Sequence, residues 1–108
     1  MIDQIAFALG RNDEIPNIEL AINLCNTHNT AGVAEIVDGL NHKDKRIAND
    51  CIKVLYEIGE RKPELISPYA STFLNLLMSK NNRLVWGSMT ALATIADLVP
   101  DDRRDRKS

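Results

Sequence analysis

Apolar residues recur every three or four positions along most of this chain, the spacing that places them on one face of an α-helix. The longest such stretch begins after Asp44 and continues to about residue 61. No segment alternates apolar and polar residues over the length of a β-strand. The pattern therefore predicts an all-α chain. The apolar positions of the longest stretch are Ile47, Ala48, Cys51, Ile52, Leu55 and Ile58.

The same spacing predicts further helices over about 2–9, 17–28, 31–41, 68–79 and 82–98. Asn29 or Thr30, Asp44 and Asn81 are expected to cap three of the helices, because short polar side chains accept hydrogen bonds from the free N–H groups of a first helical turn. The Ser67–Pro68 pair is expected to begin another. The residues expected to face inward are Ile2, Ile5, Ala6, Leu9, Ile18, Ala21, Ile22, Cys25, Val33, Ile36, Val37, Leu40, Phe73, Leu74, Leu77, Met78, Leu84, Val85, Ser88, Met89, Leu92 and Ile95.

An internal repeat organises these helices. Residues 31–64 align without a gap to residues 68–101 at an offset of 37, and six pairs are identical, among them Leu55/Leu92 and Ile58/Ile95. A fixed period of this size indicates stacked supersecondary units, each of which buries its apolar face against the next. We therefore expect a single domain over 1–100 with repeats over about 1–28, 30–62 and 67–99. The charged tail 101–108 is expected to be disordered.

Two segments of this repeat resemble HEAT repeats, a family of armadillo-like α-solenoids. They are Gly39–Gly59 and Leu76–Ala96. In that family two antiparallel helices meet at an Asp-containing turn, and the second helix carries an apolar face of the type Val-x-x-Ala-x-x-Ala-Leu-x-x-Ile. The turn Asp corresponds to Asp44 and is replaced by Asn81 in the later repeat. The resemblance implies a short right-handed α-α superhelix of about three helix pairs. It is strong over 31–98 and weak over 1–28.

Composition places this domain among soluble proteins. The 108 residues are 44% apolar and 26% charged, which is ordinary for a globular domain. The longest apolar run, Ile5–Leu9, is too short to cross a bilayer, and no cationic region precedes an apolar one at the N-terminus. Cys25 and Cys51 each fall on an apolar helical face, as reduced, buried thiols do. We therefore expect a cytoplasmic protein.

Charge is unevenly distributed along the chain. The net charge is −2, but residues 1–40 hold six acids and one base, whereas residues 41–100 hold six acids and eight bases. The fold is therefore expected to have an acidic end and a weakly basic end. Such a dipole would favour head-to-tail contact or an orientated encounter with a charged partner.

Residues suited to catalysis are sparse. Cys25 and His28 lie three apart on one predicted helix, a spacing that could join a thiol and an imidazole. The favoured interpretation is structural, because Cys25 lies on the apolar face and His28 at the helix end. The two cysteines and two histidines form no zinc-like set, and every glycine is isolated, so no phosphate loop is present. We expect no cofactor, no metal and no enzymatic activity.

The second helices of the repeats offer a binding surface instead, since in a solenoid of the resembled kind they line the concave side. Trp86, the only tryptophan, is predicted to point away from the core, and exposed tryptophans favour binding sites. Gly87 could let a partner approach closely; alternatively, Trp86 packs on a neighbouring helix and Gly87 makes room for it. Asp50 and Glu57 are placed on the same surface. The predicted partner-binding residues are Trp86, Arg83, Thr90, Asn49, Lys53 and Arg46.

These observations predict a non-catalytic protein–protein interaction or scaffold module. The alternative is a nucleic-acid-binding module, as the resemblance to HEAT-like DNA alkylation-repair proteins implies, with bases from two equivalent turns contacting phosphates. The net acidic charge disfavours it. The last repeat ends in an apolar face without a partner in the chain, so we also expect self-association there, or further repeats. The bases of the two turns are Lys43, Lys45, Arg46, Lys80 and Arg83.

Overall fold

Helices provide all the regular structure in the part of the chain that the computed structural model describes, residues 2–10 and 13–98. Within these ranges no strand is present, which confirms the all-α prediction. The tail 101–108, which the sequence predicts to be disordered, lies outside the described residues. The α-helices are α1 (Ile15–Asn26), α2 (Thr30–Gly39), α3 (Lys45–Arg61), α4 (Ala70–Leu76) and α5 (Asn82–Ile95); the 3-10 helices are η1 (Ile2–Gln4), η2 (Pro63–Leu65) and η3 (Ser67–Tyr69).

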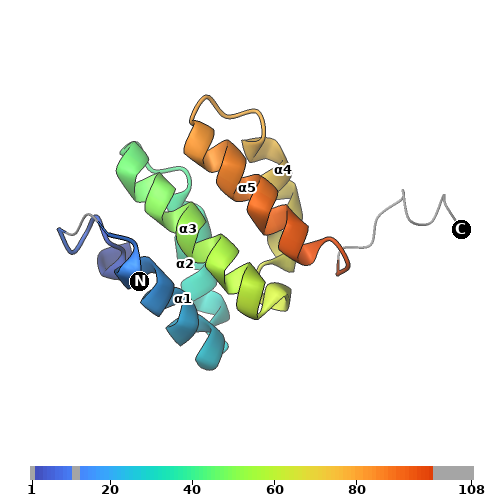
Figure 1. The fold of residues 1–108 in the computed structure, drawn as a ribbon, viewed down its shortest axis with the longest axis horizontal. Helices are drawn as coiled ribbons and strands as arrows, with labels where there is room; N and C mark the ends of the chain where they lie inside the picture. Colours follow the sequence, from blue (N-terminus) through green and yellow to red (C-terminus); the bar gives the residue numbers. More distant parts are fainter. Residues whose placement is uncertain (1, 11–12, 99–108) are drawn as a thin grey trace, which may run out of the picture.

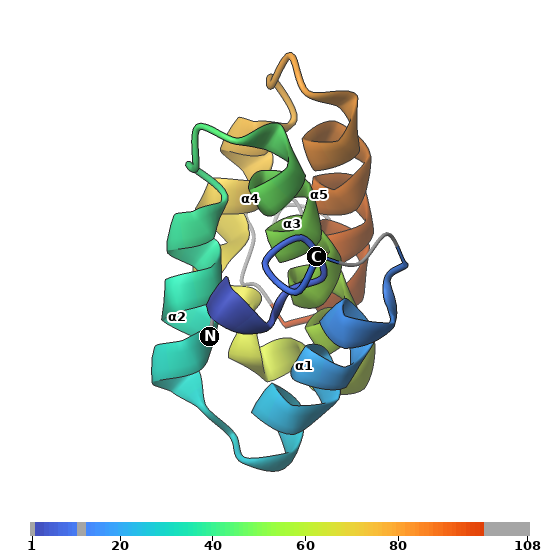
Figure 2. The ribbon, with the colours of Figure 1, turned by 90° about the vertical axis from the view of Figure 1, so that its left-hand side faces the viewer.

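The α-helices lie in two layers. Helices α1, α3 and α5 lie side by side in one layer, with α3 in the middle (Figure 1). Helices α2 and α4 form the second layer behind it, and the short η1 lies beside α2 (Figure 2). Because α3 contacts α1, α2 and α5, it is the helix around which the others are arranged.

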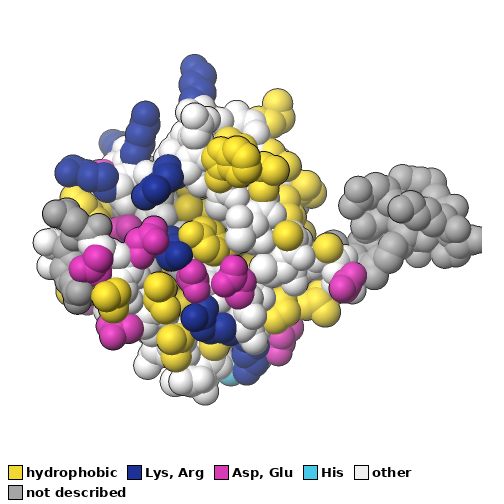
Figure 3. Space-filling view, viewed as in Figure 1, with side chains coloured by type: hydrophobic (Ala, Val, Ile, Leu, Met, Phe, Trp, Pro, Cys, Tyr) yellow, Lys and Arg dark blue, Asp and Glu magenta, His cyan; other side chains and the backbone are white. Residues whose placement is uncertain are grey.

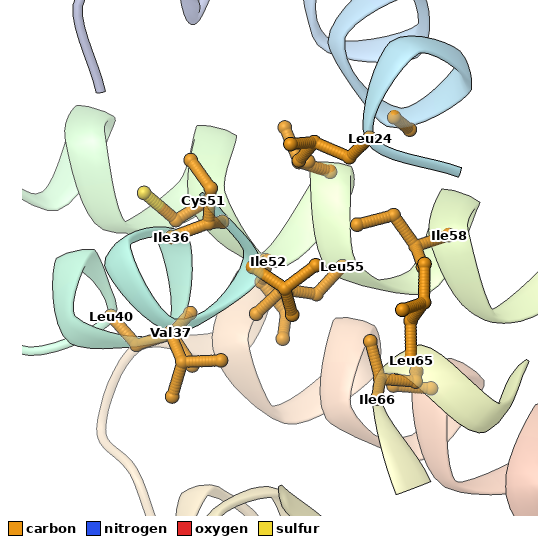
Figure 4. Packing of buried hydrophobic residues seen from close by; sticks show 14 of the residues in the cluster. Leu24, Ile36, Val37, Leu40, Cys51, Ile52, Leu55, Ile58, Leu65 and Ile66 are labelled. Carbon is orange, nitrogen blue, oxygen red and sulfur yellow. The ribbon is translucent and has the colours of Figure 1, made fainter. Parts of the chain in front are cut away.

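The core fills the space between these layers. Leu24 of α1, Ile36 of α2 and the Leu55 and Ile58 side chains of α3 point toward one another (Figure 4), and each is fully buried. Burying one such side chain contributes about 1.5–3 kcal/mol. The inward positions predicted for α2 and α3 are confirmed, apart from Ile47, which is half-buried.

Three predicted helix caps are confirmed. The Asn29 side chain accepts a hydrogen bond from the Gly32 N–H (2.8 Å), and that of Asp44 accepts one from the Arg46 N–H (2.9 Å). Asn81 accepts one in the same way from the Arg83 N–H at 3.1 Å. Asp44 and Asn81 are equivalent in the internal repeat, so α3 and α5 begin at matching positions.

The predicted helix over 2–9 is wrong. Only Ile2–Gln4 forms a 3-10 helix, and turns follow to Gly10, whose φ of 72° is left-handed. A segment this short cannot sustain an isolated helix. Side chains from elsewhere take its N–H groups instead: Ala6 N–H donates to Asn17 (2.8 Å) and Phe7 N–H to Asp50 (2.7 Å).

The predicted helix over 68–79 is wrong at both ends, because α4 covers only Ala70–Leu76. Two 3-10 helices, η2 and η3, cover Pro63–Tyr69, and the α-helix starts only at Ala70. Ser67 does not cap it, because its hydroxyl donates to the Glu64 carbonyl (3.3 Å). The prolines at 63 and 68 lack N–H groups, so a continuous ladder of helical hydrogen bonds cannot form through this segment. Helix α5 likewise ends at Ile95 rather than at about 98.

Several residues predicted to face inward are exposed instead. Most lie on α4, on the turn after it and on α5, where no other part of the described chain covers them, whereas Leu9 precedes α1 and Ile22 lies on it. Ile2, Ile18, Val85 and Leu92 are half-buried. On α1 the predicted face is only partly right, because Leu20 and Leu24 are buried instead of Ile18 and Ile22. On α4 and α5 the spacing identified the apolar side of each helix but not the element that would cover it. The exposed residues are Leu9, Ile22, Leu74, Leu77, Met78 and Met89.

Candidate functional site

A shallow groove between α3 and α5 brings together five of the six predicted partner-binding residues. Its volume of about 190 Å³ is below the usual range for small-molecule and cofactor pockets and is of the size of one or two side chains. We call it the α3–α5 groove. It is lined by Asn49, Ile52, Lys53 and Tyr56 of α3, by Arg83, Trp86, Gly87 and Thr90 of α5, and by Glu14, the residue before α1.

Gly87 sets the distance between the two helices that form the groove. A methyl group built on Gly87 would lie 2.5 Å from Cγ1 of Ile52, well inside van der Waals contact. The residue that approaches Gly87 is therefore Ile52 of the same chain. The sequence offered two interpretations of Gly87, namely that it admits a partner or makes room for Trp86. The structure gives a different one, because the close neighbour of Gly87 is Ile52.

Trp86 stands on the α5 side of the groove and is 67% exposed, as its position in the helical pattern predicted. Its backbone carbonyl accepts a hydrogen bond from the Thr90 hydroxyl (3.1 Å), so Thr90 is turned back toward its own helix. On the α3 side, Asn49 accepts a hydrogen bond from the Asn81 side chain at 2.8 Å. This hydrogen bond connects α3 to the residue that caps α5, at one end of the groove.

A cluster of charged residues lies along α3, beginning at Lys53 in the groove and continuing toward the C-terminal end of the helix. Glu57 is only 8% exposed, and its carboxylate accepts hydrogen bonds from Lys53 Nζ (2.8 Å) and Arg61 Nη1 (2.6 Å). Lys53 also lies 3.4 Å from Glu14 and 4.9 Å from the centroid of the Tyr56 ring. Glu57 was placed on the open surface by the sequence pattern, and this is wrong, because its two partners hold it against the protein.

These ion pairs fix the protonation states of the cluster. Burial alone would raise the pKa of Glu57, but the hydrogen bonds from Lys53 and Arg61 outweigh it and lower that pKa. Burial would likewise lower the pKa of Lys53, yet its contacts with Glu57 and Tyr56 raise it. Both side chains are therefore charged at neutral pH, and neither is poised to exchange a proton there.

Arg46 and Asp50 do not belong to the groove. The Arg46 guanidinium hydrogen-bonds to Asp44 (3.1 Å) and lies 4.4 Å from the centroid of the Phe7 ring. Asp50 accepts hydrogen bonds from the Phe7 N–H (2.7 Å) and from the fully buried side chain of Asn17 (2.9 Å). Both residues hold the N-terminal segment against α3. Nothing in the helical pattern of α3 could reveal this, because the contacts come from residues about 30 or more positions away.

The cysteine and histidine candidates stay apart from the groove. Cys25 is buried in α1, and burial raises the pKa of its thiol, which disfavours the reactive thiolate. His28 is exposed just beyond the helix end, with a φ of 49°. Across the described ranges, no three His, Cys, Asp or Glu side chains come close enough to hold a metal ion.

The basic residues of the two equivalent turns are all exposed or half-buried. Lys and Arg side chains gather at the upper left of Figure 3, over the turns that precede α3 and α5. Of the five, Arg46 is paired with Asp44, and Arg83 lines the groove. The turns therefore present a local positive surface beside one end of the α3–α5 groove.

Known proteins give no further information about this site. Comparisons with protein-family models, with curated proteins and with solved structures found no match to this chain. Within residues 2–10 and 13–98, no helix combines the length and the apolar character that a membrane crossing requires. A function for this chain is therefore inferred from the geometry of the groove and of the surrounding surface.

Proposed function

We propose that this chain is a non-catalytic protein-interaction module that binds a short segment of a partner protein in the α3–α5 groove. The observation that carries the proposal is Trp86, a large aromatic side chain that is mostly exposed beside a groove of side-chain size. Tryptophan is among the residues that contribute most to binding when a partner covers them.

The size of the Trp86 side chain sets the expected contribution to binding. An aromatic side chain of this kind buries about 150–250 Å², and roughly two thirds of it is still open here. Covering about 100–170 Å² at about 25 cal/mol/Å² contributes about 2.5–4 kcal/mol. Removal of the indole should therefore weaken binding by at least about sixtyfold, since about 1.4 kcal/mol corresponds to a factor of ten.

The charged cluster supports a binding role over a catalytic one. Lys53, Glu57 and Arg61 keep fixed charges at neutral pH and are held by one another. Fixed charges beside an apolar contact favour one orientation of a partner more than they add affinity. Arg83, which has no ion pair among the described residues, offers a free cation at the same groove for a carboxylate on the partner.

A HEAT-like solenoid is the architecture we propose for this module. The internal repeat, the equivalent caps at Asp44 and Asn81, and the parallel placement of α3 and α5 in one layer support it. In such a stack the second helices of successive repeats form one continuous surface for partners. The α3–α5 groove lies on that surface, between the second helices of the middle and last repeats.

Selection from a displayed library of random peptides tests the proposal without a known partner. Enriched peptides should bind the folded protein in solution, and Trp86→Ala should weaken them by at least about sixtyfold. Arg83→Ala should weaken those that carry a carboxylate. The matched control is Leu9→Ala, an exposed apolar residue outside the groove, which should leave binding unchanged. A library that yields no binder, or binders indifferent to Trp86, would contradict the proposal.

Binding of nucleic acid is the second candidate, favoured by the bases of the two turns. Fluorescence anisotropy with a labelled duplex, at low and moderate salt, separates the two. Phosphate contacts lose affinity steeply as salt rises, whereas an interaction centred on an aromatic side chain does not. We expect no duplex binding. Salt-sensitive binding that disappears in Lys43→Ala/Lys80→Ala, with Trp86→Ala unaffected, would favour the nucleic-acid alternative.

A further inference from the structure

The outward side of α4 and α5 presents an apolar surface with no cover from the described chain. Met78 is 89% exposed and Leu74 is 54% exposed, and hydrophobic side chains follow α5 and the right-hand edge of the described part in Figure 3. Adjacent exposed apolar residues of this number are unusual on a monomer and mark interaction sites. We call this surface the outer face. It consists of Leu74, Leu77, Met78, Val85, Met89 and Leu92.

The internal repeat shows what such a surface is suited to contact. Four of the six residues of the outer face correspond, at an offset of 37, to Val37, Leu40, Ile52 and Leu55. Those four are buried, and Ile52 touches α5 at Gly87. The outer face therefore repeats, in chemistry and helical position, a surface that already receives a pair of helices in this fold.

The outer face is also free of charge. Helix α4 contains no charged residue, and the single charged residue of α5, Arg83, lines the α3–α5 groove instead. A highly charged partner would gain little there, because the two helices themselves offer it no residue of opposite sign and only Lys80, in the turn between them, lies beside the face. A surface of the same uncharged kind fits without unpaired charges.

We propose that two copies of this chain associate through their outer faces, related by a two-fold axis. In such an isologous contact each copy offers the same uncharged apolar surface to the other. The outer face is outside the α3–α5 groove, so this association goes beyond the proposed peptide binding and leaves the groove open.

Head-to-tail stacking fits the structure less well. The described residues up to position 40 carry six acids and no Lys or Arg. Docking the outer face on that end would bury carboxylates against Leu and Met side chains without partners. The acidic and basic ends expected from the sequence do not favour this stacking either, because the bases after position 40 lie at the turns and along α3 and not on the outer face.

The dimensions of the face set the expected affinity. Helix α5 has 14 residues and is therefore about 21 Å long, and two packed helices span about 20 Å. The contact covers about 400 Å² per copy, or about 800 Å² in total, below the size of stable complexes. A dimer with a Kd in the micromolar range is therefore expected, formed at high concentration and lost on dilution.

Sedimentation velocity on the full chain, from about 1 µM to about 200 µM, tests the proposal because that range brackets the expected Kd. The mass should rise from 12.1 kDa toward twice that value and stop there. A strict monomer throughout would overturn the proposal and leave the face to another protein or to further repeats. Growth beyond the dimer would overturn the two-fold arrangement.

Leu74→Lys identifies the surface, since a two-fold contact brings two added lysines into one apolar interface. It should weaken dimerisation by at least about tenfold. Leu9→Lys is the matched control, because Leu9 is 53% exposed against 54% for Leu74 and lies at the other end of the fold. Circular dichroism confirms that both variants remain folded. A dimer that persists in Leu74→Lys and in Met78→Lys would overturn the assignment. Peptide binding in the groove should be unchanged in either variant, so this test stands apart from that of the proposed function.

Discussion

Gly87→Ala should destabilise the fold, although alanine is the better helix former. A methyl group at this position would lie 2.5 Å from Cγ1 and 3.0 Å from Cγ2 of Ile52. Real Cβ atoms do not approach other heavy atoms that closely, so α3 and α5 must separate or Ile52 must leave its rotamer. Either response disturbs the contact that forms the floor of the α3–α5 groove.

Two opposing effects determine the magnitude. Overpacking a core costs about 1–3 kcal/mol, whereas replacing glycine by alanine inside a helix recovers about 1 kcal/mol. Gly87→Ala should therefore lower the free energy of unfolding by up to about 2 kcal/mol. In an Ile52→Ala background both close contacts disappear and only the Ile52 Cβ, 3.3 Å away, remains. There the same substitution should be neutral or stabilising by up to about 1 kcal/mol.

Urea unfolding followed by circular dichroism measures all four members of this cycle. Ala93→Gly, at an exposed position of the same helix, measures the effect of helix propensity on stability without a change in packing. The expected coupling between positions 52 and 87 is about 2 kcal/mol. If Gly87→Ala stabilises the wild-type protein as much as Ala93→Gly destabilises it, α3 and α5 are not in close contact and the origin of the groove is wrong.

Four further experiments test the interior, the last of them on a pair of substitutions. Ser88→Ala should raise the free energy of unfolding by about 1 kcal/mol in thermal or urea unfolding, because the buried Ser88 hydroxyl has no hydrogen-bond partner. Cys51 should react with a thiol reagent only on unfolding, since it is fully buried and burial raises its pKa to about 12. Glu57→Gln should cost about 1–3 kcal/mol at pH 7. Because the folded state lowers the pKa of Glu57, its contribution is present above the ordinary value of about 4.3 and is lost as the pH falls through the folded pKa, so wild type and variant should converge in acid. Leu55→Ala should cost about 2–5 kcal/mol in urea unfolding and Leu92→Ala about half as much, since Leu55 is fully buried and Leu92 is not.

Local chemistry was predictable from the sequence. The caps at Asn29, Asp44 and Asn81 follow from a short polar side chain placed before an apolar helical face, and both signals lie within a few residues. The exposure of Trp86 follows from its position on α5, because the helical period fixes which side of a helix a residue occupies. The sequence predicted that Asn49 and Trp86 belong to one surface formed by the second helices, and both line the α3–α5 groove.

Contacts between distant segments were not predictable in the same way. Residues 2–10 have the spacing of a helix, yet Asn17 and Asp50 take the N–H groups that would have formed it. Asp50 lies 43 residues from Phe7, and no pattern within α3 distinguishes an acid that binds a backbone from one that faces solvent. Glu57 was also misplaced, because the helical pattern does not show that two neighbouring cations hold its carboxylate against the protein.

Leu55 and Leu92 show where the limit of such inference lies. They are the same residue at equivalent positions of the repeat, on helices that begin with equivalent caps. Leu55 is fully buried because α4 and α5 follow it in the chain, whereas nothing in the described chain follows α5 on its outward side. Hydrophobic periodicity shows which face of a helix avoids water. It does not show which other helix or chain covers that face. The outer face is an apolar face that the described residues leave uncovered, and for this reason we propose it as the surface of association.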